Sequence, residues 1–136
     1  MEANKVVVII DMDAPAGVAV NAAALVGVGL GAELPDMVGE DSRDGSGYAH
    51  PGICIHPIPV LKADAARLVE LREAAAAREG VVVHDINQVA RMSRTYAEYL
   101  ATMSGTKAED LVYTALAIHG PRQTVDSLTG ALALYR

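Results

Sequence analysis

The feature that most constrains this chain is its N-terminal stretch, 5–31, where a buried strand is followed by a helix with almost no polar residues. KVVVII is a short run of mostly β-branched residues ending at Asp11, which is typical of a central strand covered on both faces. After the turn DMDAPAG comes VAVNAAALVGVGLG, whose only polar residue is Asn21. We expect the other strands and helices to be built around this strand-turn-helix unit.

Composition limits the core and the partners. A chain of 136 residues is long enough for one domain with a real core, and the absence of Phe and Trp leaves aliphatic side chains to fill it. The net charge is −6, and nucleic-acid binders neutralise phosphates with a basic surface, so RNA and DNA are disfavoured as partners. A lone cysteine, Cys54, forms no internal disulfide, which favours a cytoplasmic location.

The rest of the chain alternates between strand and helix patterns. Residues 32–51 are rich in Pro, Gly, Ser and acidic residues, which predicts either a lid over a site or a tolerated insertion. Prolines in 53–61 predict an edge strand, and Asp64 is a plausible N-cap for a helix to Glu79. The remaining expected elements are a helix over 16–30, strands over 81–84, 111–120 and 132–135, and helices over 95–102 and 121–128.

This order of elements predicts an α/β layer fold with a mixed sheet, and a single domain over 1–136. The N-terminus lacks the basic region of a signal peptide. Residues 18–30 are too few to span a bilayer of about 30 Å as a helix. We therefore expect a buried helix here and no association with a membrane.

One candidate site lies at the end of the first strand. Asp11 and Asp13 form D-x-D where open α/β sheets bind ligands. In haloacid-dehalogenase-type phosphatases this pattern holds Mg²⁺, but here Pro15 replaces the required Thr or Val, and the downstream lysine and acidic pair are missing. The alternative is that the carboxylates cap the turn and the helix. The histidines have no metal-ligand spacing, so no metal or cofactor is expected.

A second set of polar residues follows from the buried elements. Asn21 would lose about 1–3 kcal/mol if buried without a partner, so it bonds to a neighbouring loop or faces a pocket. His84 and Asp85 end the strand VVVH, and Arg91 follows in the polar segment behind it. Since ligands bind at this edge of an α/β sheet, we expect these groups to converge.

Nearly the whole chain resembles a bacterial family of unknown function that is similar in fold to type-II peptidyl-tRNA hydrolases. KVVVIIDMDAPAGVAVNAAALVGVGLG resembles the first strand, turn and helix of those hydrolases, and VVVHDINQ resembles their strand ending in an aspartate of the catalytic region. TALAIHGPRQTVDSLTGALALY resembles their closing strand, corner, helix and final strand, whereas AHPGICIHPIPVLKAD is typical of the uncharacterised family itself. The resemblance implies a three-layer sandwich, with helices on both faces of a four- to five-stranded mixed sheet, and a homodimer.

The departures from the hydrolases bear on activity. Their lysine before the first helix is replaced here by Gly17, their glutamine by Asn21 and their histidine by Ala24, while Asp85 and Thr114 match. Losing the lysine removes a positive charge for the tRNA end and a candidate activator of water. Together with the negative net charge, this argues against peptidyl-tRNA hydrolysis.

Three functional hypotheses follow. In the first, the chain is a peptidyl-tRNA hydrolase II-like protein without that activity, and its cleft binds a small molecule or peptide. The residues assigned to binding in this hypothesis are Asp11, Asp13, His84, Arg91 and Thr114. In the second, the chain is an acyl-ester or amide hydrolase in which Asp85 orients water and Asn21 stabilises the carbonyl oxygen. In the third, it is a non-catalytic, dimeric interaction module.

Overall fold

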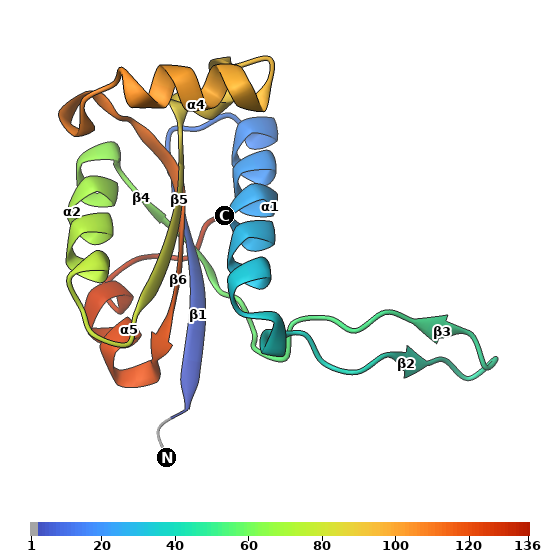
Figure 1. Ribbon diagram of the computed structural model, residues 1–136. Coiled ribbons are helices and arrows are strands. Elements are labelled where there is room, and N and C mark those ends of the chain that lie inside the picture. Colours follow the sequence, from blue (N-terminus) through green and yellow to red (C-terminus); the bar gives the residue numbers. More distant parts are fainter. Residues whose placement is uncertain (1–2) are drawn as a thin grey trace.

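The structure, a computed structural model that describes residues 3–136, has a mixed four-stranded sheet as the middle of three layers (Figure 1). In order across the sheet, the strands are β4 (Val60–Ala63), β1 (Asn4–Asp11), β6 (Tyr113–Pro121) and β5 (Val82–Asn87). β1 is parallel to β4 and antiparallel to β6, which is antiparallel to β5. One face is covered by α1 (Ala16–Glu33), the other by α2 (Ala65–Ala76) and α5 (Arg122–Thr129). The expected α/β class, mixed sheet and helices on both faces are confirmed.

The KVVVII run is the central strand that the sequence predicts. β1 pairs with β4 on one side and β6 on the other, and Val8 lies opposite Ala117, Ile9 opposite Leu116. Its residues from Val6 to Ile10 are buried, with alternate side chains in the two cores. Both faces of β1 are therefore apolar because each face is buried in one of the two cores.

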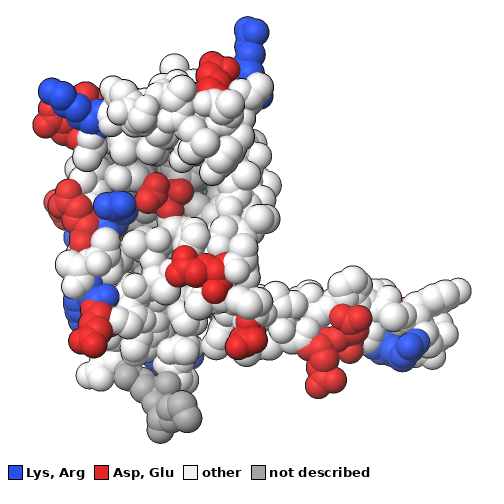
Figure 2. Space-filling view, viewed as in Figure 1, with Lys and Arg blue, Asp and Glu red and all other residues white. Residues whose placement is uncertain are grey.

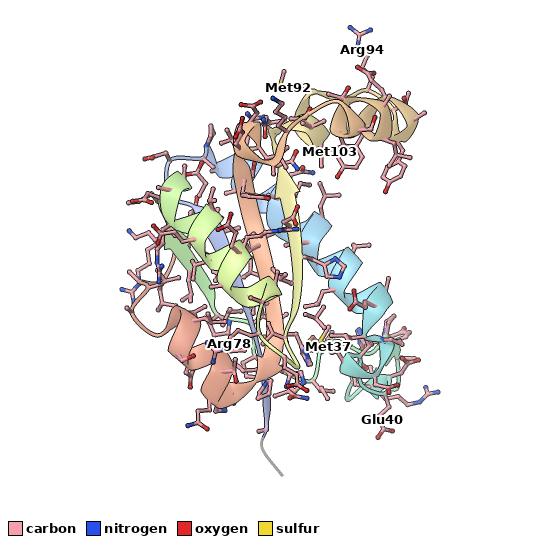
Figure 3. The ribbon with its side chains drawn as sticks, turned by 60° about the vertical axis from the view of Figure 1, so that its left-hand side comes forward. Met37, Glu40, Arg78, Met92, Arg94 and Met103 are labelled. Atoms are coloured by element: carbon pink, nitrogen blue, oxygen red, sulfur yellow. The ribbon has the colours of Figure 1, made fainter. Side chains whose placement is uncertain are left out.

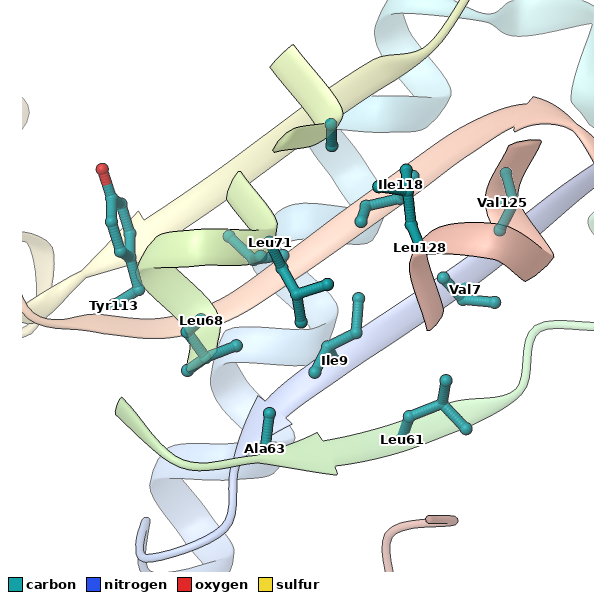
Figure 4. Packing of buried hydrophobic residues seen from close by; sticks show 12 residues of the cluster. Val7, Ile9, Leu61, Ala63, Leu68, Leu71, Tyr113, Ile118, Val125 and Leu128 are labelled. Carbon is teal, nitrogen blue, oxygen red and sulfur yellow. The ribbon is translucent and has the colours of Figure 1, made fainter. Parts of the chain in front are cut away.

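The two cores differ in the size of their side chains. The core under α1 is small, with Ala19, Ala22, Val26, Ala115 and Ala117 among its members. The core under α2 and α5 is filled by larger aliphatic side chains and one tyrosine, including Ile9, Leu68, Leu71, Leu128 and Tyr113 (Figure 4). Small side chains let α1 lie close to the sheet, as its sequence predicts.

The expectation that α1 is a buried helix, too short to span a bilayer, is wrong in part. α1 runs to Glu33, and its buried residues are confined to one stripe, Ala19, Ala22, Val26 and Leu30. In the described part of the chain, it alone has the length and hydropathy of a membrane-spanning helix, with 22% of that stretch buried inside the protein. Burial within the protein does not explain the apolar residues on the outer side of α1.

Two expectations in the middle of the chain need correction. Residues 32–51 were expected to be irregular, but they contain the short helix η1 (Pro35–Met37) and the paired strands β2 (Ser42–Arg43) and β3 (Ala49–His50). The edge strand expected over 53–61 is β4, and it starts only at Val60 because the prolines before it cannot donate to the sheet.

The second half of the chain follows the sequence more closely. Asp64 caps α2 by accepting a hydrogen bond from the Arg67 amide at 2.8 Å. The helix expected over 95–102 is α4 (Tyr96–Ser104). The segment before it holds a further helix, α3 (Gln88–Met92), and β5 continues to Asn87 instead of ending before Asp85. The strand expected over 132–135 is reduced to a bridge between Leu134 and Leu61.

Candidate functional site

The N-terminal half of α1 faces the end of β5 and the helices α3 and α4 (Figure 1). Side chains of these elements line a groove. Its inner pocket has a volume of about 270 Å³ and is lined by Gly17, Val18, Asn21, Ala22, Leu25, Ile86, Asn87, Ala90, Arg91 and Thr114. An outer compartment of about 430 Å³ is lined by Leu25, Asp85, Ile86, Ala90, Ser93, Arg94, Thr95, Tyr96 and Tyr99. Leu25, Ile86 and Ala90 line both hollows, so the two are adjacent and share a boundary.

A β-bulge shapes the inner pocket. Ile86 pairs with Ala115 but Asn87 pairs with Tyr113, so Thr114 is an additional residue on β6. A bulge changes the direction of the side chains around it. Here it brings Ile86, Asn87 and Thr114 to the same pocket.

Asn87, which was not predicted as a site residue, is buried and caps α3. Its Oδ1 accepts a hydrogen bond from the Val89 amide at 2.9 Å, and its amide nitrogen lies 3.5 Å from the sulfur of Met103, on the side of α4 that faces the sheet (Figure 3). An asparagine between a strand and a helix is a recognised N-cap pattern, so the sequence did contain the signal.

Three polar side chains of the inner pocket have no hydrogen-bond partner within the described residues, 3–136: Asn21 and Arg91, which are exposed, and Thr114, which is buried. Thr114 is only 8% exposed. Its hydroxyl is not among the buried atoms shut off from solvent without a partner, so it is open to the pocket. A hydroxyl that is open to the pocket and bonded to no protein group is free to donate to, or accept from, a bound polar group.

The first turn of α1 adds positive potential to the pocket. Gly17 and Val18 line it, and this turn has neither a side-chain cap nor an acidic residue. The first amides of a helix have no intrahelical acceptor and carry the positive end of the helix dipole. With the guanidinium of Arg91, they make the pocket favourable for an anionic group although the whole chain is acidic.

The residues predicted to act as a catalytic pair line different hollows. Asn21 lines the inner pocket, whereas Asp85 lines the outer compartment, with its Oδ2 3.4 Å from Nε of Arg72. Successive side chains of a strand point to opposite faces, so Asp85 turns towards α2 while Ile86 faces α1. The catalytic roles of Asn21 and Asp85 stay predictions.

Three other predicted site residues line neither hollow. His84 packs against Gly29 and pairs with Glu33, Nε2 to Oε1 at 2.9 Å. Asp11 accepts a hydrogen bond from the amide of Asp13 at 3.0 Å, which closes the turn before α1. The contact confirms the part of the capping alternative that concerns the turn, but neither carboxylate caps α1, whose N-cap is Pro15 without a side-chain cap. No cluster of metal-binding side chains is present among residues 3–136.

Aromatic side chains from α4 form one wall of the outer compartment. The ring centroids of Tyr96 and Tyr99 are 5.4 Å apart. Partial burial, followed by the nearby Asp85 carboxylate, raises the pKa of Tyr99 above its usual range. This compartment offers apolar and aromatic surface to whatever part of a ligand extends beyond the inner pocket.

The fold and groove define an α/β protein with a mixed four-stranded sheet and a small polar pocket at one end of its first helix. The chain belongs to the family described as "Protein of unknown function (DUF2000)", whose model matches residues 4–136. This confirms the expected membership in a family of unknown function.

A solved structure shows the same fold. It is titled as a protein of unknown function, Atu0240, from Agrobacterium tumefaciens strain C58, with a TM-score of 0.90, 22% sequence identity and coverage of 100% of both chains. No curated protein matches the chain. None of these findings supports the expected likeness to type-II peptidyl-tRNA hydrolases, which stays a prediction.

Proposed function

We propose that this protein binds a small organic acid in the inner pocket, either a free carboxylic acid or the carboxylate end of a short peptide. The observation that carries the proposal is the unpaired hydroxyl of Thr114, nine-tenths buried, beside the unpaired side chains of Asn21 and Arg91. Polar groups that converge on an otherwise apolar pocket are typical of ligand sites.

The charges favour a carboxylate. A guanidinium matches a carboxylate geometrically, because two parallel N–H groups can bind its two oxygens. The free amides at the start of α1 favour the same charge. Asn21 and Thr114 can both donate and accept, so they suit a carbonyl, hydroxyl or amide group next to the acid.

The size of the pocket limits the ligand. Ligand pockets commonly measure about 300–1,000 Å³, so a pocket of about 270 Å³ suits a small molecule. Val18, Leu25 and Ile86 would contact its apolar part. A peptide would place its terminal residue here and continue over Leu25 into the outer compartment, towards Tyr96.

Binding of an acid does not require catalysis by Asp85. That carboxylate faces Arg72 and lies outside the inner pocket, so nothing places it against the carbonyl that Asn21 would bind. We therefore propose that the pocket binds an acid, in preference to the hypothesis that it hydrolyses an ester or amide.

The experiment is a titration with small carboxylic acids and short peptides, each beside its primary amide, followed by NMR and calorimetry. Acids are expected to shift the backbone amides of Gly17, Val18 and Arg91, and the neutral amides are not. Shifts in the inner pocket alone would indicate a free acid, and shifts that reach Tyr96 and Tyr99 would indicate a peptide. Equal binding of acids and amides, or no binding by either at millimolar concentration, would overturn the proposal.

Two variants and one control connect the binding to the pocket. Arg91→Gln removes a charge-assisted hydrogen bond worth about 1.5–3 kcal/mol and should weaken binding of the acid more than about tenfold. Thr114→Val should weaken it less, because a neutral bond is lost. Arg122→Gln, at the exposed start of α5, is the control and should leave binding unchanged.

A further inference from the structure

A hairpin arm projects from the body of the protein beside the C-terminal end of α1 (Figure 1). It comprises residues 38–55, and its two sides are joined by backbone hydrogen bonds in and beyond β2 and β3. At its base, the Ile55 amide donates to the Met37 carbonyl at 2.8 Å and the Gly39 amide to the Ile53 carbonyl at 2.9 Å. The arm is thus a built extension and not an irregular loop.

Local contacts specify the arm in detail. At the tip, a carboxylate oxygen of Asp44 accepts hydrogen bonds from the amides of Ser46 and Tyr48, at 2.9 and 3.1 Å. Near the base, a Cβ at Gly52 would lie 1.8 Å from the carbonyl oxygen of Gly39, so only glycine allows the two sides to come this close. The hairpin is therefore specified by its own residues.

The arm nevertheless exposes apolar side chains to solvent. Ile53 is 82% exposed and Tyr48 72%, and Ile55 is exposed as well. A two-stranded hairpin on its own is at best marginally stable in water. The arm therefore lacks a surface to pack on.

The outer face of α1 also has no surface to pack on. Val20 is 70% exposed and Val28 73%, and Ala24 lies between them on the same exposed side. No residue from 16 to 32 is charged, and the surface over α1 is uniformly white in Figure 2. Helices that are apolar all round are normally buried.

We propose that the protein is a homodimer in which the arm of each copy lies along the outer face of α1 of its partner. The arm points away from its own α1, so it can reach the helix of a second copy but does not fold back on its own (Figure 1). An exchange of this kind is closed and symmetric, since each copy gives one arm and offers one helix face.

The dimensions of the two surfaces agree. One side of the arm, 38–44, extends over about 23 Å at the rise of a strand. α1 has 18 residues and is about 27 Å long at the rise of a helix. Two such contacts, each about 10 Å wide, bury on the order of 1,000 Å², close to what a specific interface needs.

The charges also favour a second copy over a lipid surface. Glu40, Asp41 and Asp44 make the arm acidic, and the uncharged outer face of α1 offers them no like charge. Helices that bind membrane surfaces usually carry Lys and Arg on their polar face, and α1 has none.

The test is the oligomeric state of the full chain, measured by sedimentation equilibrium. The wild type is expected to have twice the 14.2 kDa mass of one chain. Ile53→Ser with Ile55→Ser on the arm, and separately Val28→Glu on α1, should each weaken the dimer more than tenfold. All three residues are exposed, so circular dichroism should show an intact fold. Val69→Ser, at an exposed apolar position on α2, is the control and should stay dimeric.

Hydrogen exchange of the arm supplies a second readout. Protection of amides 38–55 should rise with protein concentration in the wild type and be lost in Val28→Glu, whose arm sequence is intact. A monomeric wild type, or a dimer that survives both sets of variants, would overturn the proposal. A monomer that floats with phosphatidylcholine vesicles would overturn it in favour of a lipid partner.

Discussion

His84 packs against Gly29 so closely that a Cβ at residue 29 would lie 2.8 Å from Nδ1 of the imidazole ring. Nε2 of the same ring is 2.9 Å from Oε1 of Glu33, one turn further along α1. The partly exposed ring therefore lies between α1 and β5, held on one side by Gly29 and at its Nε2 by Glu33. This contact determines how near the helix approaches the strand that borders the groove.

Gly29→Ala should lower the free energy of unfolding by about 1–2 kcal/mol. Forcing a methyl group into this contact costs about 1–3 kcal/mol, against a gain of up to about 1 kcal/mol in helix propensity. Urea unfolding measures the difference. Gly27→Ala is the matched control on the same helix, since nothing lies within 4 Å of its Cβ position, and it should be neutral or stabilising. Equal effects of the two variants would contradict a tight contact at Gly29.

Thr114→Val should change the free energy of unfolding by less than about 1 kcal/mol, because the hydroxyl that it removes bonds to no group among the described residues and is open to the pocket. Thr129→Val is the control: that hydroxyl, also buried, donates to the Val125 carbonyl at 2.8 Å, so its loss should cost about 1 kcal/mol. Both variants are compared by thermal and urea unfolding without ligand. A loss at Thr114 as large as at Thr129 would mean that its hydroxyl is satisfied within the protein.

Stability should fall as the pH drops below about 6.5 because of His119. Partial burial, and then the nearby His56, lowers the pKa of this histidine below 6.5, and its Nδ1 is buried without a partner. The unfolded chain then binds more protons than the folded one, so stability is lost as the pH falls through the unfolded pKa and levels off below the folded pKa. The acidic residues that line the same surface hollow as His56 and His119 are Glu33 and Asp36.

His119→Gln should reduce this pH dependence, because glutamine does not titrate in this range. Urea unfolding of both proteins across about pH 5 to 8 checks it. Parallel stability curves for wild type and variant would assign the acid sensitivity to another group.

Gly52→Ala should disorder the arm and leave the body folded. The added methyl group would collide with the Gly39 carbonyl, which lies 1.8 Å from the Cβ position. The expected result is a chain with normal circular dichroism, loss of protection of amides 38–55 and, if the arm joins two copies, a monomeric mass. Gly45→Ala, near the tip of the same arm, has free space around its Cβ and should behave as wild type.

Purified protein should not release peptide from peptidyl-tRNA. Asn21 and Asp85 line different hollows, and Asp85 is held near Arg72. The assay compares the wild type with Asp85→Asn. Turnover that disappears in the variant would instead show that Asp85 acts in catalysis, as the second hypothesis holds.

Part of the site could be predicted from the residues, and part could not. Asn21 stood out as the one polar residue on an apolar helix, and Arg91 and Thr114 were proposed for binding; all three line the inner pocket. Asp11, Asp13 and His84 were assigned from their place at strand ends, but all three lie outside the two hollows: the Asp11 carboxylate accepts from the Asp13 amide in the turn, and His84 packs against α1. A position at a strand end does not say which way a side chain points.

The sequence by itself determined the elements that depend on local periodicity and caps. The β-branched run of β1, the stop at its turn and the Asp64 cap of α2 follow from interactions within a few residues. Tertiary structure alone decided the bulge that places Asn87 and Thr114 in one pocket, and the arm that rises from 38–55. The bulge depends on pairing between β5 and β6, which are distant in the chain and whose register is set by packing of the whole sheet. The arm depends on the close backbone approach of Gly39 and Gly52, which composition does not reveal.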